Sequence, residues 1–260
     1  MLAGEPNPTP YDLNFSMFGF PVRISIWFWV GAAVIVGQGP LGGPALVAGI
    51  LAILVSILIH ELGHTFAFRH FGISSRIVLY HFGGIAIPDA FGSPWRIRSS
   101  GSGDPFSQIV IAAMGPLVQL ISGLLVVLLL RLSNYEATLG FRVVDEWLRL
   151  AEGNPLPSRE LMLFVDVYLF VSVYWALLNL LPVYPLDGGQ ISRNLFLIYS
   201  RSSAVQQSLS LSMWTAIAVA IYGFTNGRMF LGIMFAMLAH SSYQTMQAYT
   251  GRGGGFGSPW

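Results

Sequence analysis

The sequence contains no cysteine, and this absence excludes several kinds of chemistry at once. Without thiols the chain can form no disulfide, no thiolate zinc site and no cysteine nucleophile. Lysine is absent as well, so the 13 basic residues are all arginines, and 12 acidic residues nearly balance them. The sequence therefore has no lysine-rich stripe that would indicate nucleic acid as a partner. Any metal ion must be held by His, Asp or Glu side chains.

Charged residues of either sign are also scarce. They make up 10% of the chain, whereas a soluble domain usually carries about 25%. Hydrophobic residues make up 54%, and the mean hydropathy is +0.63. This composition predicts a protein whose surroundings are a lipid bilayer.

Six apolar stretches approach the ~20 residues that a helix needs to cross a bilayer. Gln, Ser and Asn dilute the last two. The pattern predicts an all-α polytopic membrane protein with about six transmembrane helices. The stretches are residues 22–38, 45–69, 106–130, 161–181, 205–222 and 229–247.

A segment of different character lies between the second and third stretches. Residues 77–87 (IVLYHFGGIAI) place β-branched and aromatic side chains on both sides of Gly83 and Gly84. This pattern predicts a short β-hairpin. Non-helical backbone at membrane depth must line a cavity or be buried in protein, so we expect a re-entrant hairpin.

The motif His60-Glu61-Leu62-Gly63-His64 carries the strongest chemical signal. In a helix, residues i and i+4 lie on one face, so both imidazoles can bind the same metal ion. Glu61, next to the first ligand, is placed to act as a general base. Ionisable side chains inside an apolar span are costly and usually functional.

Two histidines leave a catalytic zinc one protein ligand short. Asp187 is the best candidate for the third ligand. Pro182 and Pro185 should end the preceding helix, and the two glycines after Asp187 should let the chain turn tightly. Two membrane crossings separate Asp187 from His64, which returns both to the same side. Weaker candidates are His70, His81, Asp166 and His240.

Three motifs together resemble the site-2 protease family of intramembrane metalloproteases. They are HELGH in one span, Gly115-Pro116 in the next, and the N-x-x-P-x-x-x-x-D-G motif that begins at Asn179. The resemblance covers about residues 18–189. It implies hydrolysis of a peptide bond within or next to a transmembrane segment of a membrane-protein substrate.

The resemblance also implies the roles of single residues. His60, His64 and Asp187 would bind one Zn²⁺ per chain, and Glu61 would be catalytic. Asn179, Gly83 and Gly84 would contact the substrate. Gln119 departs from the family pattern, because many members have asparagine after the Gly-Pro pair. We expect a compact form of this family, without the PDZ or CBS domains that relatives often carry.

The expected domain organisation is simple. Residues 1–20 form a polar N-terminal tail that lacks the basic start and the cleavage site of a secretory signal. Residues 21–250 form a single transmembrane metalloprotease domain with a catalytic core at about 45–190, and residues 251–260 form a Gly-rich C-terminal tail.

The arginines give a modest signal for orientation under the positive-inside rule. Six arginines are expected on one side of the membrane, which is the side nearest the HELGH motif. They are Arg69, Arg76, Arg96, Arg98, Arg193 and Arg201. We therefore expect a prokaryotic plasma-membrane protein with its active site towards the cytoplasm. The oligomeric state is not indicated.

Other functions compete for the same residues. The strongest alternative is a membrane metal-ion transporter or metal-binding scaffold that uses the same His, His and Asp residues. It gives no reason for Glu61, and the chain shows no repeat. An aspartyl intramembrane protease is suggested by the G-x-G-D sequence of residues 101–104, but this lies in a polar loop.

Overall fold

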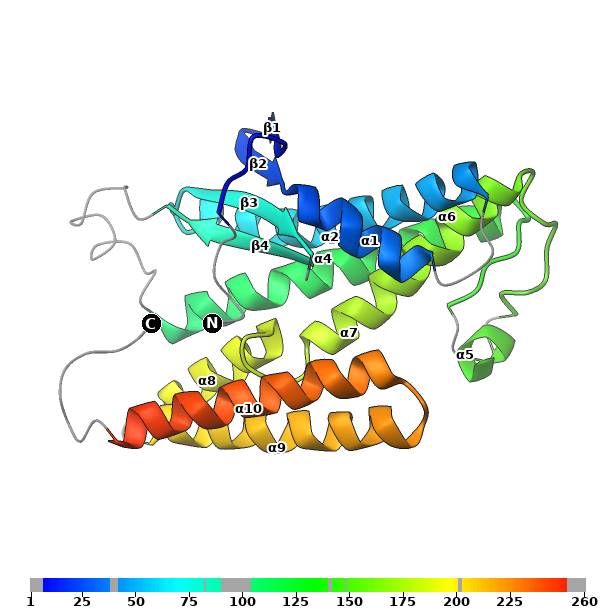
Figure 1. The fold of residues 1–260 in the computed structure, drawn as a ribbon. Coiled ribbons are helices and arrows are strands. Elements are labelled where there is room, and N and C mark those ends of the chain that lie inside the picture. The colour runs from blue at the N-terminus through cyan, green and yellow to red at the C-terminus, as the bar shows by residue number, and fades with distance from the viewer. Residues whose placement is uncertain are drawn as a thin grey trace. The chain divides into compact units, whose positions relative to one another are not determined.

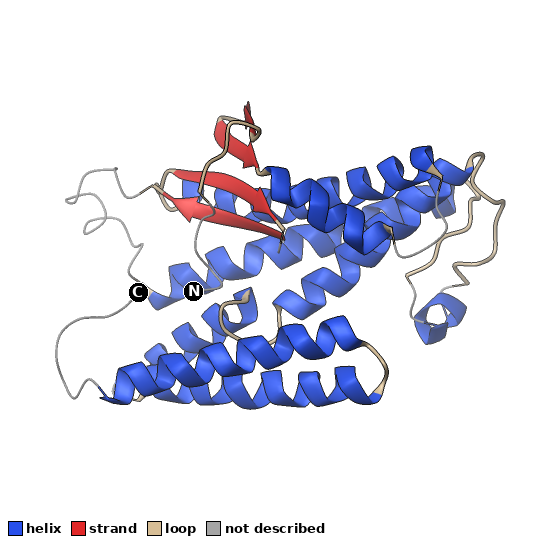
Figure 2. Ribbon diagram, in the orientation of Figure 1, coloured by secondary structure: helices blue, strands red, loops and turns tan. Residues whose placement is uncertain are grey.

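The structure is a computed structural model that is mostly helical and contains a small sheet (Figures 1 and 2). The chain divides into two compact units. The first consists of residues 1–102 and 114–178, and the second of residues 103–113 and 179–260. The structure describes residues 7–37, 42–81, 83–89, 104–139, 142–147, 149–200 and 203–251. Most of the predicted C-terminal tail lies outside the described residues.

The described part of the first unit contains a four-stranded sheet with the order β1-β2-β3-β4. The outer pairs are antiparallel, whereas β2 and β3 are parallel. The strands are β1 (Leu13–Met17), β2 (Phe20–Ile24), β3 (Ser75–Tyr80) and β4 (Gly83–Pro88). The last two are the strands of the predicted hairpin. The first two were not expected, because β1 lies in the predicted tail and β2 lies at the start of the predicted first span.

Alternating apolar side chains join this sheet to the helices beside it. Phe20, Val22 and Ile24 of β2 and Ile77 and Leu79 of β3 are all buried in one core. The period of two places them on one face of the sheet. That face packs against helices α1 (Ile26–Val36) and α2 (Gly43–His70).

Among the described residues, four helical stretches are long and apolar enough to cross a membrane. The predicted first span is instead β2 followed by α1, whose 11 residues extend only ~16 Å. The sixth predicted span forms α10 (Met229–Gly251), which is not among the four. The four are α2, α4 (Pro105–Leu132), residues 159–179 and α9 (Ala204–Thr225). Six crossings therefore stay a prediction.

The span at residues 159–179 is not a uniform α-helix. It consists of α6 (Arg159–Phe170), a π-helical turn η1 (Val171–Trp175) and α7 (Ala176–Asn179). Widened π turns inside α-helices occur frequently at functional sites. The short helix α5 (Arg142–Trp147) lies in the connection between α4 and α6.

The second unit is built on α8 (Asp187–Tyr199), α9 and α10, with α9 packed against both of the others. Gly223 and Gly232 let α9 and α10 approach closely, since a β-carbon on Gly223 would lie 2.6 Å from the backbone nitrogen of Gly232. A hydrogen bond of 2.7 Å joins the buried hydroxyls of Ser212 and Ser242.

Candidate metal centre

His60 and His64 face each other on α2, as their spacing predicts. Their Nε2 atoms lie 3.1 Å apart, and the ring centroids lie 4.8 Å apart. Both side chains are buried, at 3% and 7% exposure. Two buried imidazole nitrogens that point at one place are the donor arrangement of a zinc site.

The backbone of α4 passes directly beside this pair. A β-carbon on Gly115 would overlap Nε2 of His64, and a β-carbon on Gly63 would overlap the main-chain oxygen of Met114. Glycine is therefore required on both helices for this close approach. The Gly115-Pro116 motif thus shapes the wall of the histidine site.

Glu61 is buried against strand β4. A β-carbon on Gly84 would lie 2.5 Å from Cγ and 2.6 Å from Oε1 of Glu61. Its neighbour Gly83 has φ +124°, a conformation that side chains rarely adopt, and packs on the ring of Trp175. The two predicted glycines therefore bring the hairpin backbone next to the Glu61 carboxyl group.

Tyr80 adds a polar group at the end of β3. It pairs with Gly83 across the hairpin. Burial raises the pKa of the Tyr80 phenol, and the negative charge of Glu61 raises it further. A neutral tyrosine hydroxyl therefore belongs to the electrostatic surroundings of Glu61. The sequence gives no signal for Tyr80, because an aromatic residue in a strand is common.

Asp187 is the first residue of α8, in the second unit, and is 8% exposed. A carboxylate at a helix N-terminus is stabilised by the helix dipole. The turn before it is tight: a β-carbon on Gly188 would overlap the main-chain oxygen of Leu180, and one on Gly189 would lie 2.6 Å from the nitrogen of Tyr184. The glycines after Asp187 thus permit the turn that the sequence predicts.

Asn179 ends α7 and is buried, at 9% exposure. It lies eight residues before Asp187 in the second unit. Its contact with a substrate stays a prediction.

His60 and His64 lie in the first unit and Asp187 lies in the second, so the binding of one metal ion by all three side chains stays a prediction. Two histidines and one carboxylate fit zinc, because catalytic zinc sites use this donor set and keep a fourth position open. The weaker candidates lie elsewhere. His70 and His81 are exposed, Asp166 is half-buried, and His240 contacts Gln244 at 2.8 Å.

The G-x-G-D alternative has a structural explanation. Asp104 accepts a hydrogen bond of 3.3 Å from the backbone nitrogen of Ser107 and so caps the start of α4. Residues 101–103 lie outside the described residues.

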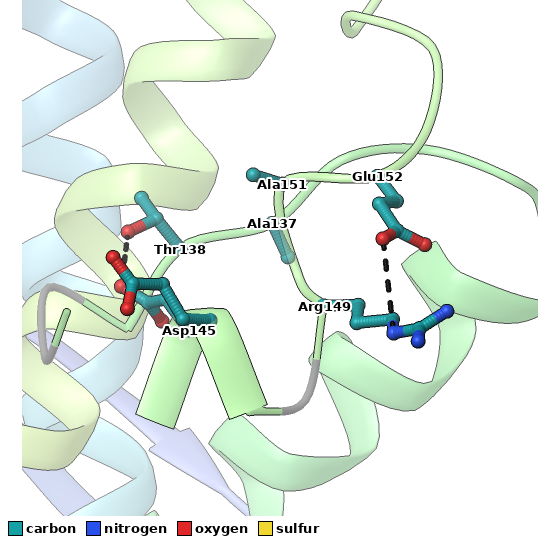
Figure 3. Close-up of a pocket in the computed structure, with 7 residues that line it drawn as sticks. Ala137, Thr138, Asp145, Arg149, Ala151 and Glu152 are labelled. Atoms are coloured by element: carbon teal, nitrogen blue, oxygen red, sulfur yellow. Dashed lines mark hydrogen bonds and ion pairs between the residues drawn. The ribbon is translucent and has the colours of Figure 1, made fainter. Parts of the chain in front are cut away.

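A pocket of about 490 Å³ lies in the connection between α4 and α6 (Figure 3). Its charged groups are engaged locally: Asp145 accepts a hydrogen bond from Thr138 at 3.0 Å, and Arg149 lies 3.8 Å from Glu152. None of the predicted site residues lines it. The lining residues are Ala137, Thr138, Asp145, Glu146, Arg149, Ala151 and Glu152.

Two further polar residues adjoin the site. Oε1 of Gln119 lies 2.8 Å from Nδ1 of His60, and Nε2 of Gln119 lies 2.9 Å from the hydroxyl of Ser56. The sequence held a signal for Ser56, because it precedes His60 by four residues and so shares its helix face. For Gln119 the sequence shows only a departure from the family motif.

Known proteins resemble this chain in sequence. A zinc metalloprotease of Methanocaldococcus jannaschii is 27% identical over 69% of this chain and 43% of its own length. A Synechocystis sp. protein with a zinc-metalloprotease name is 26% identical over 81% of this chain and 52% of its own length. The chain thus spans about half the length of these curated relatives.

The fold also has a solved counterpart. The site-2 protease from Methanocaldococcus jannaschii matches with a TM-score of 0.55 and 20% identity, over 91% of this chain and 95% of that one. The model of peptidase family M50 matches residues 48–223, a range that includes His60, His64 and Asp187. The predicted resemblance to the site-2 proteases is confirmed, and the chain belongs to peptidase family M50.

Proposed function

We propose that this protein is an intramembrane zinc metalloprotease that hydrolyses a peptide bond within or next to a transmembrane segment of a membrane-protein substrate. The observation that carries the proposal is the facing pair of buried histidines with Glu61 between them on an apolar, 28-residue helix. Such a cluster in a membrane span is costly to keep without a function. Zinc metalloproteases among the relatives support the same activity.

His60, His64 and Asp187 are the proposed ligands of one zinc ion per chain. Nitrogen from imidazole and oxygen from carboxylate are both ligands that zinc accepts. When bound, zinc would supply Lewis acidity to the scissile carbonyl and to the attacking water. The spacing within one helix pairs the two histidines but does not include Asp187, so a variant of Asp187 is part of the test.

Glu61 is the proposed general base. Its carboxylate takes a proton from the attacking water and later returns a proton to the leaving amine. The backbone of β4 holds this carboxylate from one side, because Gly84 leaves no side chain between them. Tyr80 adds a neutral polar group beside Glu61.

Strand β4 is the proposed docking edge for the substrate. It stands at the end of the order β1-β2-β3-β4 of the described strands, and an extended peptide can add to such an edge through main-chain hydrogen bonds. Gly83 and Gly84 would then contact substrate near Glu61. Asn179 is proposed to orient the substrate or the developing oxyanion.

The proposed setting is a prokaryotic plasma membrane, with the hairpin re-entrant and the active site towards the cytoplasm. Six crossings would include α1 with β2 and α10 besides the four apolar helical stretches found among the described residues. The arginine distribution supports the orientation.

Zinc content and cleavage of single-span membrane substrates in detergent test the proposal together. The wild type should hold about one zinc and cut. Glu61→Gln should hold zinc and not cut, whereas its control Glu160→Gln, on the exposed start of α6, should do both. Asp187→Ala should lose zinc, and Asp166→Ala should keep it. Normal cleavage by Glu61→Gln, or full zinc in Asp187→Ala, contradicts the assignment.

A metal transporter is the remaining competitor. It would use the same ligands, yet it has no need for a general base beside His60. Metal uptake into vesicles that is unaffected by Glu61→Gln, without any cleavage, would favour transport.

A further inference from the structure

A chain of buried polar side chains runs from the π-helical turn η1 to His60. The hydroxyls of Ser172 and Ser56 lie 2.8 Å apart. Nε2 of Gln119 lies 2.9 Å from the Ser56 hydroxyl, and Oε1 of Gln119 lies 2.8 Å from Nδ1 of His60. Ser172, Ser56 and Gln119 are each 0% exposed. These side chains come from three helical elements, η1, α2 and α4, which therefore meet at this hydrogen-bonded network.

The surroundings of Gln119 determine which way its amide group points. Its Nε2 also lies 3.4 Å from the main-chain oxygen of Ser56. A carbonyl oxygen only accepts hydrogen bonds, so the amide nitrogen belongs on this side and the amide oxygen on the His60 side. The reversed amide would place two carbonyl oxygens against each other in a buried environment.

The amide oxygen in turn determines the state of the His60 ring. Because Oε1 of Gln119 can only accept, Nδ1 of a neutral His60 must carry the hydrogen. The lone pair is then on Nε2, the atom that lies 3.1 Å from Nε2 of His64. The network therefore presents the nitrogen that faces the second histidine as a ligand.

We propose that Gln119 is a positioning residue for the metal centre, which fixes the ring orientation and the tautomer of His60. The inference rests on the proposed function in so far as His60 is a metal ligand. Partners that hold the second nitrogen of a ligating histidine are common in metal sites. Here the partner is an amide, and it is itself held by Ser56.

Helix α4 and the π turn η1 pack closely together beside this hydrogen-bonded network. A β-carbon on Gly123 of α4 would lie 3.3 Å from Cβ of Ser172, so α4 and η1 are in close contact. The π turn places the Ser172 hydroxyl beside the hydroxyl of Ser56. Ser56 lies on α2, one helical turn before His60. Through Ser172, the π turn contacts the residue that holds Gln119.

Zinc affinity, measured by competition with a chromophoric chelator, tests the proposal. Gln119→Leu removes the acceptor and should weaken binding by about 10- to 100-fold, the usual effect of losing such a partner. Gln119→Glu keeps an acceptor at Nδ1 and should recover most of that loss. Ser122→Ala is the matched control on α4. Its hydroxyl bonds to Tyr168 and to the main-chain oxygen of Gln119, and its loss should leave zinc affinity within about twofold.

The tautomer itself provides a second measurement that needs no zinc. In the metal-free full chain, ¹⁵N NMR of labelled histidine should show His60, assigned by its loss in His60→Gln, with the hydrogen on Nδ1. In Gln119→Leu the signal should shift towards the other tautomer, and in Ser122→Ala it should not. If Gln119→Leu does not fold, all histidine signals will move. In that case the Gln119→Glu spectrum tests whether an acceptor at residue 119 keeps the hydrogen on Nδ1 of His60.

The outcomes separate this proposal from the proposed function. Wild-type affinity and an unchanged tautomer in Gln119→Leu overturn it, as does an equal loss of affinity in Gln119→Glu and Gln119→Leu. If the wild type binds no zinc but His60 shows the Nδ1–H form that Gln119→Leu loses, the metalloprotease proposal fails while the positioning of His60 by Gln119 stands.

Discussion

The carboxyl group of Glu61 occupies the space in which a side chain on residue 84 would lie. A β-carbon there would be 2.5 Å from Cγ of Glu61. Strand β4 can therefore approach helix α2 only with glycine at this position, and the two elements together hold the proposed general base.

Gly84→Ala should reduce cleavage while zinc binding persists. The added methyl group displaces the Glu61 carboxylate but does not reach the histidine rings by this contact. A displacement near 1 Å at a catalytic group can cost on the order of 10² in rate. Parallel measurements of kcat/KM and zinc content check this. Gly43→Ala is the control, because a β-carbon on Gly43 meets nothing within 4 Å.

Gly115→Ala should have the opposite pattern, with loss of zinc. Its β-carbon would overlap Nε2 of His64, the proposed ligand atom, so the ring must turn away or α4 must separate from α2. Metal analysis after purification should find well below one zinc per chain, against about one in the Gly43→Ala control. Full zinc content would show that His64 is not held by this wall.

Ser212→Ala should weaken the second unit and the proposed third ligand together. The Ser212 hydroxyl accepts a hydrogen bond of 2.8 Å from the backbone nitrogen of Tyr184, three residues before Asp187, and also bonds to Ser242. Losing such buried bonds costs about 1–3 kcal/mol. We expect a lower Tm and weaker zinc binding.

Ser208→Ala is the matched control for this prediction. The Ser208 hydroxyl, one turn earlier on α9, donates a hydrogen bond within the helix to the main-chain oxygen of Val205. It should leave zinc affinity unchanged. Equal effects of the two variants would contradict a link between Ser212 and the Asp187 turn.

Asp12 should stabilise the N-terminal strands in a pH-dependent manner. Burial acts to raise its pKa, but hydrogen bonds from Thr9 and from the backbone of Ile26, with the charge of Arg23, hold the pKa below its usual value. A lowered folded-state pKa adds stability above the unfolded-state pKa. That contribution is lost as the pH falls through the folded-state value.

Thermal unfolding in detergent across the acid range measures this effect. Asp12→Asn should lower Tm near neutral pH, and its difference from the wild type should shrink as the pH falls below the ordinary aspartate pKa. Asp89→Asn is the control, because both side chains of the Asp89–Arg76 ion pair are about one-third exposed. Exposed ion pairs contribute little to the free energy of unfolding. A constant difference at all pH values would rule out the proposed origin.

The sequence by itself determined the features that depend on neighbours along the chain. The spacing of four positions from His60 to His64 places both rings on one face of α2, since an α-helix repeats every 3.6 residues. Prolines and glycines around Asp187 likewise determine the turn that starts α8. Apolar composition indicated where α2, α4, α9 and α10 form, but not that the stretch at residues 22–38 begins with a strand.

The tertiary structure alone decided the contacts between distant segments. Gln119 meets His60 across 59 residues, and Ser56 meets Ser172 across 116. The parallel pairing of β2 with β3 places Val22 opposite Ile77. Because of this pairing, the predicted hairpin is part of a four-stranded sheet among the described residues. Such contacts depend on how helices and strands pack, and no local spacing encodes them. For this reason the proposed ligand and base residues could be named from the sequence, whereas the contacts that Gly84, Gly115 and Gln119 make with them are seen only in the folded chain.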